Sequence, residues 1–216
     1  MANRQSAKIE DRLMAAQIAI DGVLTNSRLQ DILAPYGYDS AAMTQARALY
    51  REAEDLTKAQ AREYGDKAAA TEQLQQARSA AKQRYTRTLK LARVAFKDNT
   101  DAQISLDLNS RRKTTAAGWQ EQAEKFYEGL LADPALLAQM ARFNCDQAKL
   151  QDELAQVTAV RDAHVNAYRE KGEAFQSTQT RDDKLKELDR WYADFRSVAK
   201  VALADNPQDL QMLGIN

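Results

Sequence analysis

The stretch "ARVAFKDNTDAQISLDLN" at residues 92–109 recurs in altered form as "AKVALADNPQDLQMLGIN" at residues 199–216. Sliding the whole sequence so that Ala92 falls on Ala199 aligns it without a gap, and we call this shift the repeat offset. Residues kept between the aligned halves include Gly22 with Gly129, Gly65 with Gly172, and Tyr85 with Tyr192. Self-similarity at a fixed offset is typical of a repeated structural unit. We therefore divide the chain into copy 1, residues 1–109, and copy 2, residues 110–216.

The composition predicts an all-α fold. The chain has 216 residues, of which 44% are hydrophobic and 29% charged, a balance ordinary for a globular protein. It contains only seven glycines and three prolines, so turns are few. Alanine, leucine, glutamine, glutamate, lysine and arginine are abundant, and these residues favour helix.

A short capped helix start recurs four times in the chain. The predicted cap residues are Asn26, Asn99, Asp133 and Asn206. Pro134 and Pro207 suit the first helical position, where a backbone donor is not needed. Each cap is followed seven residues later by Leu or Met, which predicts short helices that fold back as apolar lids over the ends of a bundle. Asp39 and Asp146 are expected to cap the helices that follow.

Each copy is predicted to contain two further helices. The first spans about 5–24 in copy 1 and 111–131 in copy 2, and the second, very long, spans about 40–97 and 147–204. A helix of 58 residues would reach roughly 87 Å if unbroken. The pattern predicts an elongated antiparallel helical bundle, with the two copies packed as separate bundles or as one.

The long helices either break or continue at Gly65 and Gly172. A left-handed glycine at each place would end a helix and give two three-helix bundles, similar to spectrin repeats in period only. Against a break, the segment "DKAAATEQL" at residues 66–74 is a strong helix former. We favour continuous or merely kinked helices, with Gly65, Ala68 and Ala69 at a close helix crossing.

The sequence predicts no catalytic, cofactor-binding or metal-binding residue. A single cysteine, Cys145, cannot form an internal disulfide. A di-iron bundle needs Glu-x-x-His pairs, and a zinc site needs several cysteines or histidines. The only histidine, His164, is preceded at the third position by Arg161. We expect Cys145 and His164 to be packing or surface residues and the protein not to be an enzyme.

Charge is segregated along the chain although the formal net charge is zero. Residues 78–113 contain ten basic and three acidic residues, whereas residues 185–216 contain four and five. The basic stretch indicates a polyanion site, with nucleic acid as one candidate ligand. The residues assigned to this site are Lys82, Arg87, Lys90, Arg93, Lys97, Arg111, Arg112 and Lys113. The alternatives are a solvated face, or a face paired with the acidic second half within the molecule or in a dimer.

The sequence predicts a cytoplasmic protein. The N-terminal "MANRQSAKIEDRLMAAQIAIDGVL" has charges throughout and no uninterrupted apolar core, unlike a signal peptide. No stretch approaches the roughly 20 apolar residues that span a bilayer. One cysteine gives no reason to expect an oxidising compartment.

Three stretches carry a resemblance to a known group of proteins. They are "YGYDSAAMTQARALYREAEDL" at 36–56, "YEGLLADPALLAQMARFNCD" at 127–146 and "ADNPQDLQMLGIN" at 204–216. The chain resembles, over nearly its whole length, an uncharacterised family of bacterial duplicated helical proteins. The resemblance implies the fold, and it assigns no catalytic or binding residue.

The sequence leads to a principal functional hypothesis and two alternatives. The principal hypothesis is a non-catalytic protein-interaction or scaffold module with an unknown protein partner, and a homodimer is considered as well. The first alternative is binding of nucleic acid or another polyanion through residues 78–113. The second is a membrane-active amphipathic protein, although no sustained apolar hairpin suits insertion.

Overall fold

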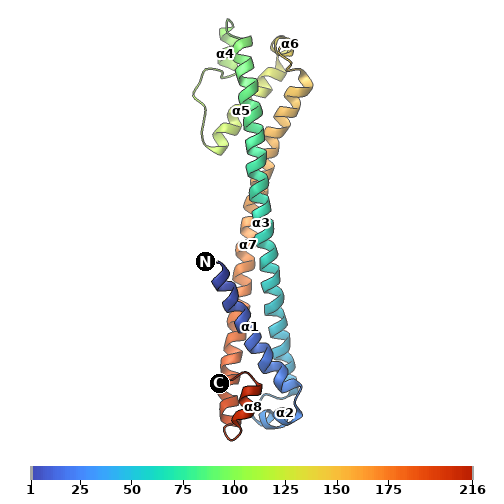
Figure 1. The fold of residues 1–216 in the computed structure, drawn as a ribbon. Coiled ribbons are helices and arrows are strands. Elements are labelled where there is room, and N and C mark those ends of the chain that lie inside the picture. Colours follow the sequence, from blue (N-terminus) through green and yellow to red (C-terminus); the bar gives the residue numbers. More distant parts are fainter. Residues whose placement is uncertain (1, 216) are drawn as a thin grey trace. The chain divides into compact units, whose positions relative to one another are not determined.

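The computed structural model describes residues 2–215, with side chains from Lys8 onward, and the fold of this part is all-α without strands. In chain order the helices are α1 (Ala2–Leu24), α2 (Ser27–Leu33), the 3₁₀ turn η1 (Ala34–Tyr36), α3 (Ser40–Ala95), α4 (Thr100–Ser105), α5 (Ala116–Ala132), α6 (Pro134–Ala141), α7 (Gln147–Ala202) and α8 (Pro207–Met212) (Figure 1). Among the described residues, none of the helices has the length and apolar character needed to cross a membrane.

The helix bounds follow the repeat offset found in the sequence. Helix α3 begins at Ser40 and ends at Ala95, and the repeat offset carries these bounds onto Gln147 and Ala202, where α7 begins and ends. The same offset carries the bounds of α4 onto those of α8. The long helices end two residues earlier than predicted.

Most of the predicted helix caps are confirmed. The side chains of Asn26, Asn99 and Asp133 each accept backbone N–H groups from the first turn of the helix, at 2.8 to 3.3 Å. Asp39 and Asp146 do the same for α3 and α7, at 2.8 and 2.9 Å. These bonds satisfy donors that a helix start otherwise leaves unpaired.

The cap predicted at Asn206 is wrong in its chemistry. Helix α8 begins at Pro207 as expected, but the Asn206 side chain makes no capping bond to it. Instead the backbone carbonyl of Asn206 accepts the N–H of Asp209 at 3.0 Å.

Replacing Asn99 with alanine is expected to cost about 1 kcal/mol of stability, because the N–H of Ala102 loses its acceptor. The matched substitution Asn206→Ala removes no capping bond and is expected to change stability by less than about 0.5 kcal/mol. Urea unfolding of both variants measures the difference. Equal losses would contradict the assignment of the caps.

The predicted start of the helix at 111–131 is also wrong, since α5 begins only at Ala116. The Thr115 hydroxyl accepts the N–H of Gly118 at 3.2 Å and caps this later start. The residues before Thr115 form a loop, and Asp107 in it has a left-handed φ of 57°. Side-chain bonds from Arg112, described below, hold this loop out of the helical conformation.

The chain forms two compact units that do not coincide with the two copies. Unit 1 contains the residues up to Gly65 and those from Gly172 onward, and unit 2 contains residues 66–171. The unit boundaries therefore fall at the two glycines kept between the copies. Each unit combines the first part of one copy with the last part of the other.

Unit 1 is built on α1, the first part of α3 and the last part of α7. Ile20, Met43 and Phe195 from these three helices are fully buried in one core. Helices α2 and α8 lie at one end of the unit (Figure 1), where Arg28 and Asp209 form an ion pair at 2.9 Å. The packing buries one apolar face of each amphipathic helix.

Unit 2 is built on the last part of α3, on α5 and on the first part of α7, with α4 and α6. Its core is rich in aromatic residues. Tyr85 lies edge-on to Trp119, Phe126 and Tyr127, with ring centroids 6.3, 5.5 and 6.1 Å apart. Edge-to-face contacts of this kind stabilise a core beyond the burial of area.

The four short helices are the apolar lids that the sequence predicts. The residues seven positions after the caps are all 0% exposed: Leu33, Leu106, Met140 and Leu213. A methyl group on Gly22 would lie 2.8 Å from the Leu213 side chain, and one on Gly129 would lie 2.7 Å from the Leu106 side chain. These two kept glycines therefore make room for the lids of α8 and α4.

Helices α3 and α7 continue through Gly65 and Gly172, which confirms the favoured alternative. The expected close crossing at Gly65 is wrong. A methyl group on either glycine would meet nothing within 4 Å, and Ala68 and Ala69 are exposed. Tight packing therefore does not explain these two glycines.

Replacing Gly65 and Gly172 with alanine is expected to raise stability by about 0.5–1 kcal/mol each, since both positions are helical and have free space. A control is Gly37→Ala, which is expected to cost about 1 kcal/mol because Gly37 has a φ of 89°. Thermal unfolding measures all three variants. A loss at Gly65 or Gly172 would show that these positions are not helical.

Candidate anion-binding surface

The eight residues predicted to bind a polyanion all lie in unit 2, where the structure separates them into two groups. Lys82, Arg87 and Lys90 are exposed on α3 and border an open groove of about 620 Å³. The remaining lining residues are Ser79, Gln83, Thr86 and Leu91. The groove lies on the solvent side of α3 because the opposite side of the helix packs into the core.

The charges at the groove are not neutralised within the described part of the chain. No described carboxylate forms an ion pair with Lys82, Arg87 or Lys90, whereas their neighbour Arg84 pairs with Asp152 at 3.2 Å. The three cations lie on little more than two turns of α3, or roughly 12 Å along the helix axis. Like charges at this spacing repel one another and produce a local positive potential.

The corresponding positions in unit 1 have the opposite character. At the repeat offset, Lys82 and Arg87 correspond to Asp189 and Asp194, and Lys90 corresponds to a serine. Both units nevertheless form a bundle of three longer helices with two lids. The bundle fold therefore does not require the basic face, which is specific to unit 2.

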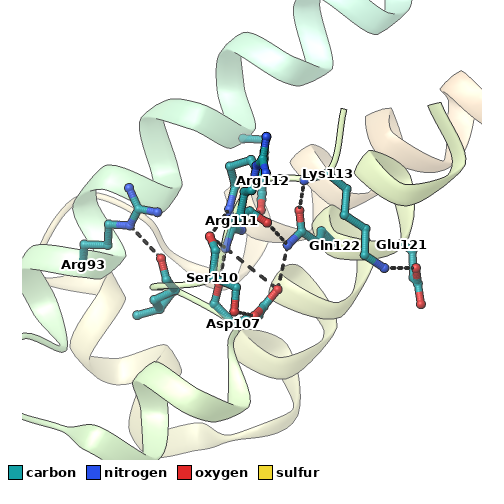
Figure 2. Close-up of polar contacts among 10 residues, drawn as sticks. Arg93, Asp107, Ser110, Arg111, Arg112, Lys113, Glu121 and Gln122 are labelled. Carbon is teal, nitrogen blue, oxygen red and sulfur yellow. Dashed lines mark hydrogen bonds and ion pairs between the residues drawn. The ribbon is translucent and has the colours of Figure 1, made fainter. Parts of the chain in front are cut away.

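Arg93 and Arg112 of the second group are engaged inside unit 2 (Figure 2). Arg93 donates from Nε to the carbonyl of Leu108 at 2.8 Å. Arg112 donates to the hydroxyl of Tyr85 at 2.7 Å and to the carbonyl of Ser110 at 2.8 Å. These bonds fasten the loop between α4 and α5 onto α3.

The same loop carries a carboxylate with a shifted pKa. Burial alone would raise the pKa of Asp107, but hydrogen bonds from Ser110 and Gln122 and the positive charge of Arg112 lower it overall. Gln122 donates to Asp107 at 2.8 Å and accepts the backbone N–H of Lys113 at 2.8 Å (Figure 2). The loop is thus a network of satisfied polar groups, and Arg112 and Lys113 take part in it.

Neither of the last two predicted residues uses its charged side chain in the groove or in the loop network. Lys97 follows α3 and pairs with the neighbouring Asp98 at 3.7 Å, with both side chains largely exposed. Arg111 contributes its backbone carbonyl, which accepts from Gln122 at 3.2 Å. The predicted stripe is therefore a three-cation groove followed by a structural loop. The groove is also lined by the polar residues Ser79, Gln83 and Thr86. They were not predicted to belong to the site, although helical spacing could have indicated them.

Cys145 and His164 occupy the kinds of position expected for them. Cys145 is fully buried, and burial raises the pKa of its thiol although Lys149 lies 3.7 Å from the sulfur. A thiol with a raised pKa is a poor nucleophile. His164 is exposed on α7, with its ring edge-on to Tyr168 at 4.9 Å.

The core of unit 2 contains a buried carboxylate. Glu153 is 4% exposed and accepts the hydroxyl of Thr88 at 2.7 Å and that of Tyr127 at 2.9 Å. Burial raises the pKa of Tyr127, and the nearby Glu153 charge raises it further. Burial also raises the pKa of Tyr85, despite the opposing charge of Arg112. Both tyrosines are therefore held in the neutral form.

Stability is expected to fall above pH 10. An unfolded tyrosine loses its proton near pH 10, whereas Tyr85 and Tyr127 keep theirs when folded, so the folded state binds more protons. Each such group lowers the free energy of unfolding by about 1.4 kcal/mol per pH unit above that value. Urea unfolding between pH 7 and pH 11 measures this loss. Tyr127→Phe should show a shallower dependence, and an unchanged slope would contradict the assignment.

Comparisons with known proteins add no relative. Models of protein families, curated proteins and solved structures all give no match to the chain. The resemblance to bacterial duplicated helical proteins accordingly stays an expectation from the sequence.

Proposed function

We propose that this chain is a non-catalytic binding module and that it binds a polyanion along the α3 groove of unit 2. One observation carries the proposal. Lys82, Arg87 and Lys90 surround a groove of about 620 Å³ and have no described carboxylate as an ion-pair partner. A fold maintains unpaired like charges at some cost in repulsion, and an anionic ligand removes that cost.

The lining of the groove suits phosphate or sulfate groups. Lysine and arginine supply the positive charge, and the amide of Gln83 and hydroxyl of Ser79 can donate hydrogen bonds to oxygen atoms. Exposed cations bind such ligands largely by releasing counterions, so affinity depends strongly on salt. We propose that the ligand is nucleic acid, which fits this chemistry, and that the protein acts in the cytoplasm. We also propose that the two copies arose from one duplication.

Charge reversal at the groove tests the proposal. The variant Lys82→Glu/Arg87→Glu/Lys90→Glu is expected to lose retention on heparin and binding to single-stranded RNA. If each cation contacts one phosphate, the slope of log affinity against log salt should fall by about 2–3 when all three are removed. Fluorescence anisotropy at several salt concentrations measures both the affinity and the slope.

A matched control makes the same change in charge elsewhere in unit 2. Lys125, Arg142 and Lys171 are exposed and lie outside the groove, and reversing them to Glu is expected to reduce binding far less. Helical circular dichroism of both variants shows that they are folded. Equal effects of the two triple variants would mean that overall charge, and not the groove, determines binding, and would contradict the proposal.

A second candidate is self-association, which the acidic character of unit 1 favours. Asp194 is exposed at the position that corresponds to Arg87, so the groove of one molecule can face unit 1 of another. Sedimentation of the wild type should then show a dimer that dissociates with salt and with Lys90→Glu. A monomer at all salt concentrations would exclude this candidate.

A further inference from the structure

Several corresponding positions contain different residues in the cores of the two units, Ala19 and Phe126 for example, and four further ones include the buried carboxylate of unit 2. In unit 2 they are Thr88, Tyr127, Cys145 and Glu153, and in unit 1 they are Phe195, Ile20, Tyr38 and Ala46. The members of each pair are related by the repeat offset. In both units the first residue comes from the last part of one copy, and the other three come from the first part of the other copy.

In unit 2 the four residues form a polar cluster that includes the small side chain of Cys145. The hydroxyl of Thr88 donates to Glu153 at 2.7 Å. Tyr127 donates to the same oxygen of Glu153 at 2.9 Å. Both buried hydroxyl groups of this cluster therefore have an acceptor, which buried polar groups require.

In unit 1 the same positions contain two aromatic residues and two smaller apolar residues. The ring of Phe195 lies edge-on to Tyr38, with centroids 5.1 Å apart. Ile20 and Ala46 belong to the same buried core. Phe195 thus packs against Tyr38 ring to ring, and this contact needs no hydrogen bond.

These residues would not fit if each copy folded on itself. A break of α3 at Gly65 and of α7 at Gly172 would place Thr88 against Ile20 and Ala46, leaving a cavity and an unpaired hydroxyl. The same break would place Phe195 in the cluster with Glu153, where it is too large and leaves the carboxylate without the Thr88 donor.

The lids also make their contacts with the other copy. The Leu213 side chain of copy 2 occupies the space beside Gly22 of copy 1. The Leu106 side chain of copy 1 occupies the space beside Gly129 of copy 2. Both lids therefore pack on a helix of the other copy, as the four core positions do.

We propose that these four pairs of residues select the exchanged arrangement, in which the copies share both units, over one in which each copy forms its own bundle. The size and polarity of these residues stabilise the exchanged arrangement, and they destabilise the arrangement in which each copy folds on itself. Because both copies have the same order of helices and the same lids, differences between them at the core are what can distinguish the two arrangements.

Exchanging Thr88 and Phe195 tests the proposal. In Thr88→Phe/Phe195→Thr the phenylalanine fits Ile20 and Ala46 of its own copy, so each copy should now fold on itself. A short bismaleimide linking two introduced cysteines reports the arrangement. Arg84→Cys/Asp152→Cys marks the exchanged form, since the two residues form an exposed ion pair across the copies. The corresponding pair within copy 1 is Gln45→Cys/Arg84→Cys.

The expected result is an 84–152 link when Thr88 and Phe195 are unchanged. In Thr88→Phe/Phe195→Thr, where each copy should fold on itself, the expected result is a 45–84 link. Mass spectrometry identifies both links. A 45–84 link no more abundant in a folded variant than in the wild type would overturn the proposal. If the variant does not fold, Thr88→Phe/Tyr127→Ile/Cys145→Tyr/Glu153→Ala decides, because it gives unit 2 the complete set of unit 1. This variant should fold, and because both units then contain the same four residues, it should give both the 84–152 link and the 45–84 link. If it is as unstable as Thr88→Phe alone, the four positions do not act as a set and the proposal fails.

Discussion

Replacing Phe195 with alanine is expected to destabilise unit 1 by about 3–5 kcal/mol. The side chain is fully buried, stacks on Trp191 with centroids 5.3 Å apart and meets Tyr38 edge-on. Removing it leaves a cavity that rigid helices can close only in part, and it also removes both ring contacts. Trp191 fluorescence in a Trp119→Phe background follows urea unfolding of unit 1.

The same substitution elsewhere on α7 provides the control. Phe175 also belongs to unit 1 but is 73% exposed, so Phe175→Ala is expected to change stability by less than about 0.5 kcal/mol. The comparison holds the helix and the chemical change constant and varies only burial. A Phe195→Ala variant as stable as Phe175→Ala would mean that Phe195 is not in the core of unit 1.

Local features of the fold could be predicted from the sequence because they depend on neighbouring residues. A cap needs a side chain and an N–H two or three residues later, so Asn99 and Asp133 were identified correctly. The lids followed from one apolar residue at a fixed distance from each cap. Asn206 shows the limit, since it precedes a proline as Asp133 does but its side chain makes no capping bond.

The partition into units could not be predicted from the pattern of the repeat. Both copies have the same order of helices, so the pattern is equally consistent with copies that fold alone and copies that exchange their ends. Helix continuity at Gly65 and Gly172 and the sizes of residues such as Thr88 and Phe195 distinguish the arrangements, and the neighbours of these residues are known only from the structure. Continuity at Gly65 was predictable because the following segment is a strong helix former.

The candidate site was predictable in its charge but not in its extent. Lys82 and Lys90 share a helix face that spacing alone indicates. The role of Arg112 depends on Tyr85, which is far away in sequence and meets it only in the folded loop. Sequence could therefore count the cations but could not separate the ones that bind loop carbonyls from the ones that face solvent.

Replacing Glu153 with alanine is expected to destabilise unit 2 by about 2–5 kcal/mol. Thr88 and Tyr127 would each lose the acceptor of a buried hydroxyl, and the removed side chain would leave a cavity. Glu153→Gln keeps the volume and one carbonyl oxygen, so it should cost less. Trp119 fluorescence in a Trp191→Phe background follows urea unfolding of unit 2.

In Glu153→Ala, stability is lost because two hydroxyl groups lose their acceptor and because a cavity is left. The four-residue variant that gives unit 2 the residues of unit 1 tests these two causes. It also lacks the carboxylate, but Phe replaces Thr88 and Ile replaces Tyr127, so neither of these two hydroxyl groups is left without its acceptor. It is expected to recover most of the stability lost in Glu153→Ala, because exchanging a complete buried polar cluster for apolar residues is often neutral, whereas removing one partner is not. Unchanged stability in Glu153→Ala would show that the carboxylate is not part of the folded core of unit 2.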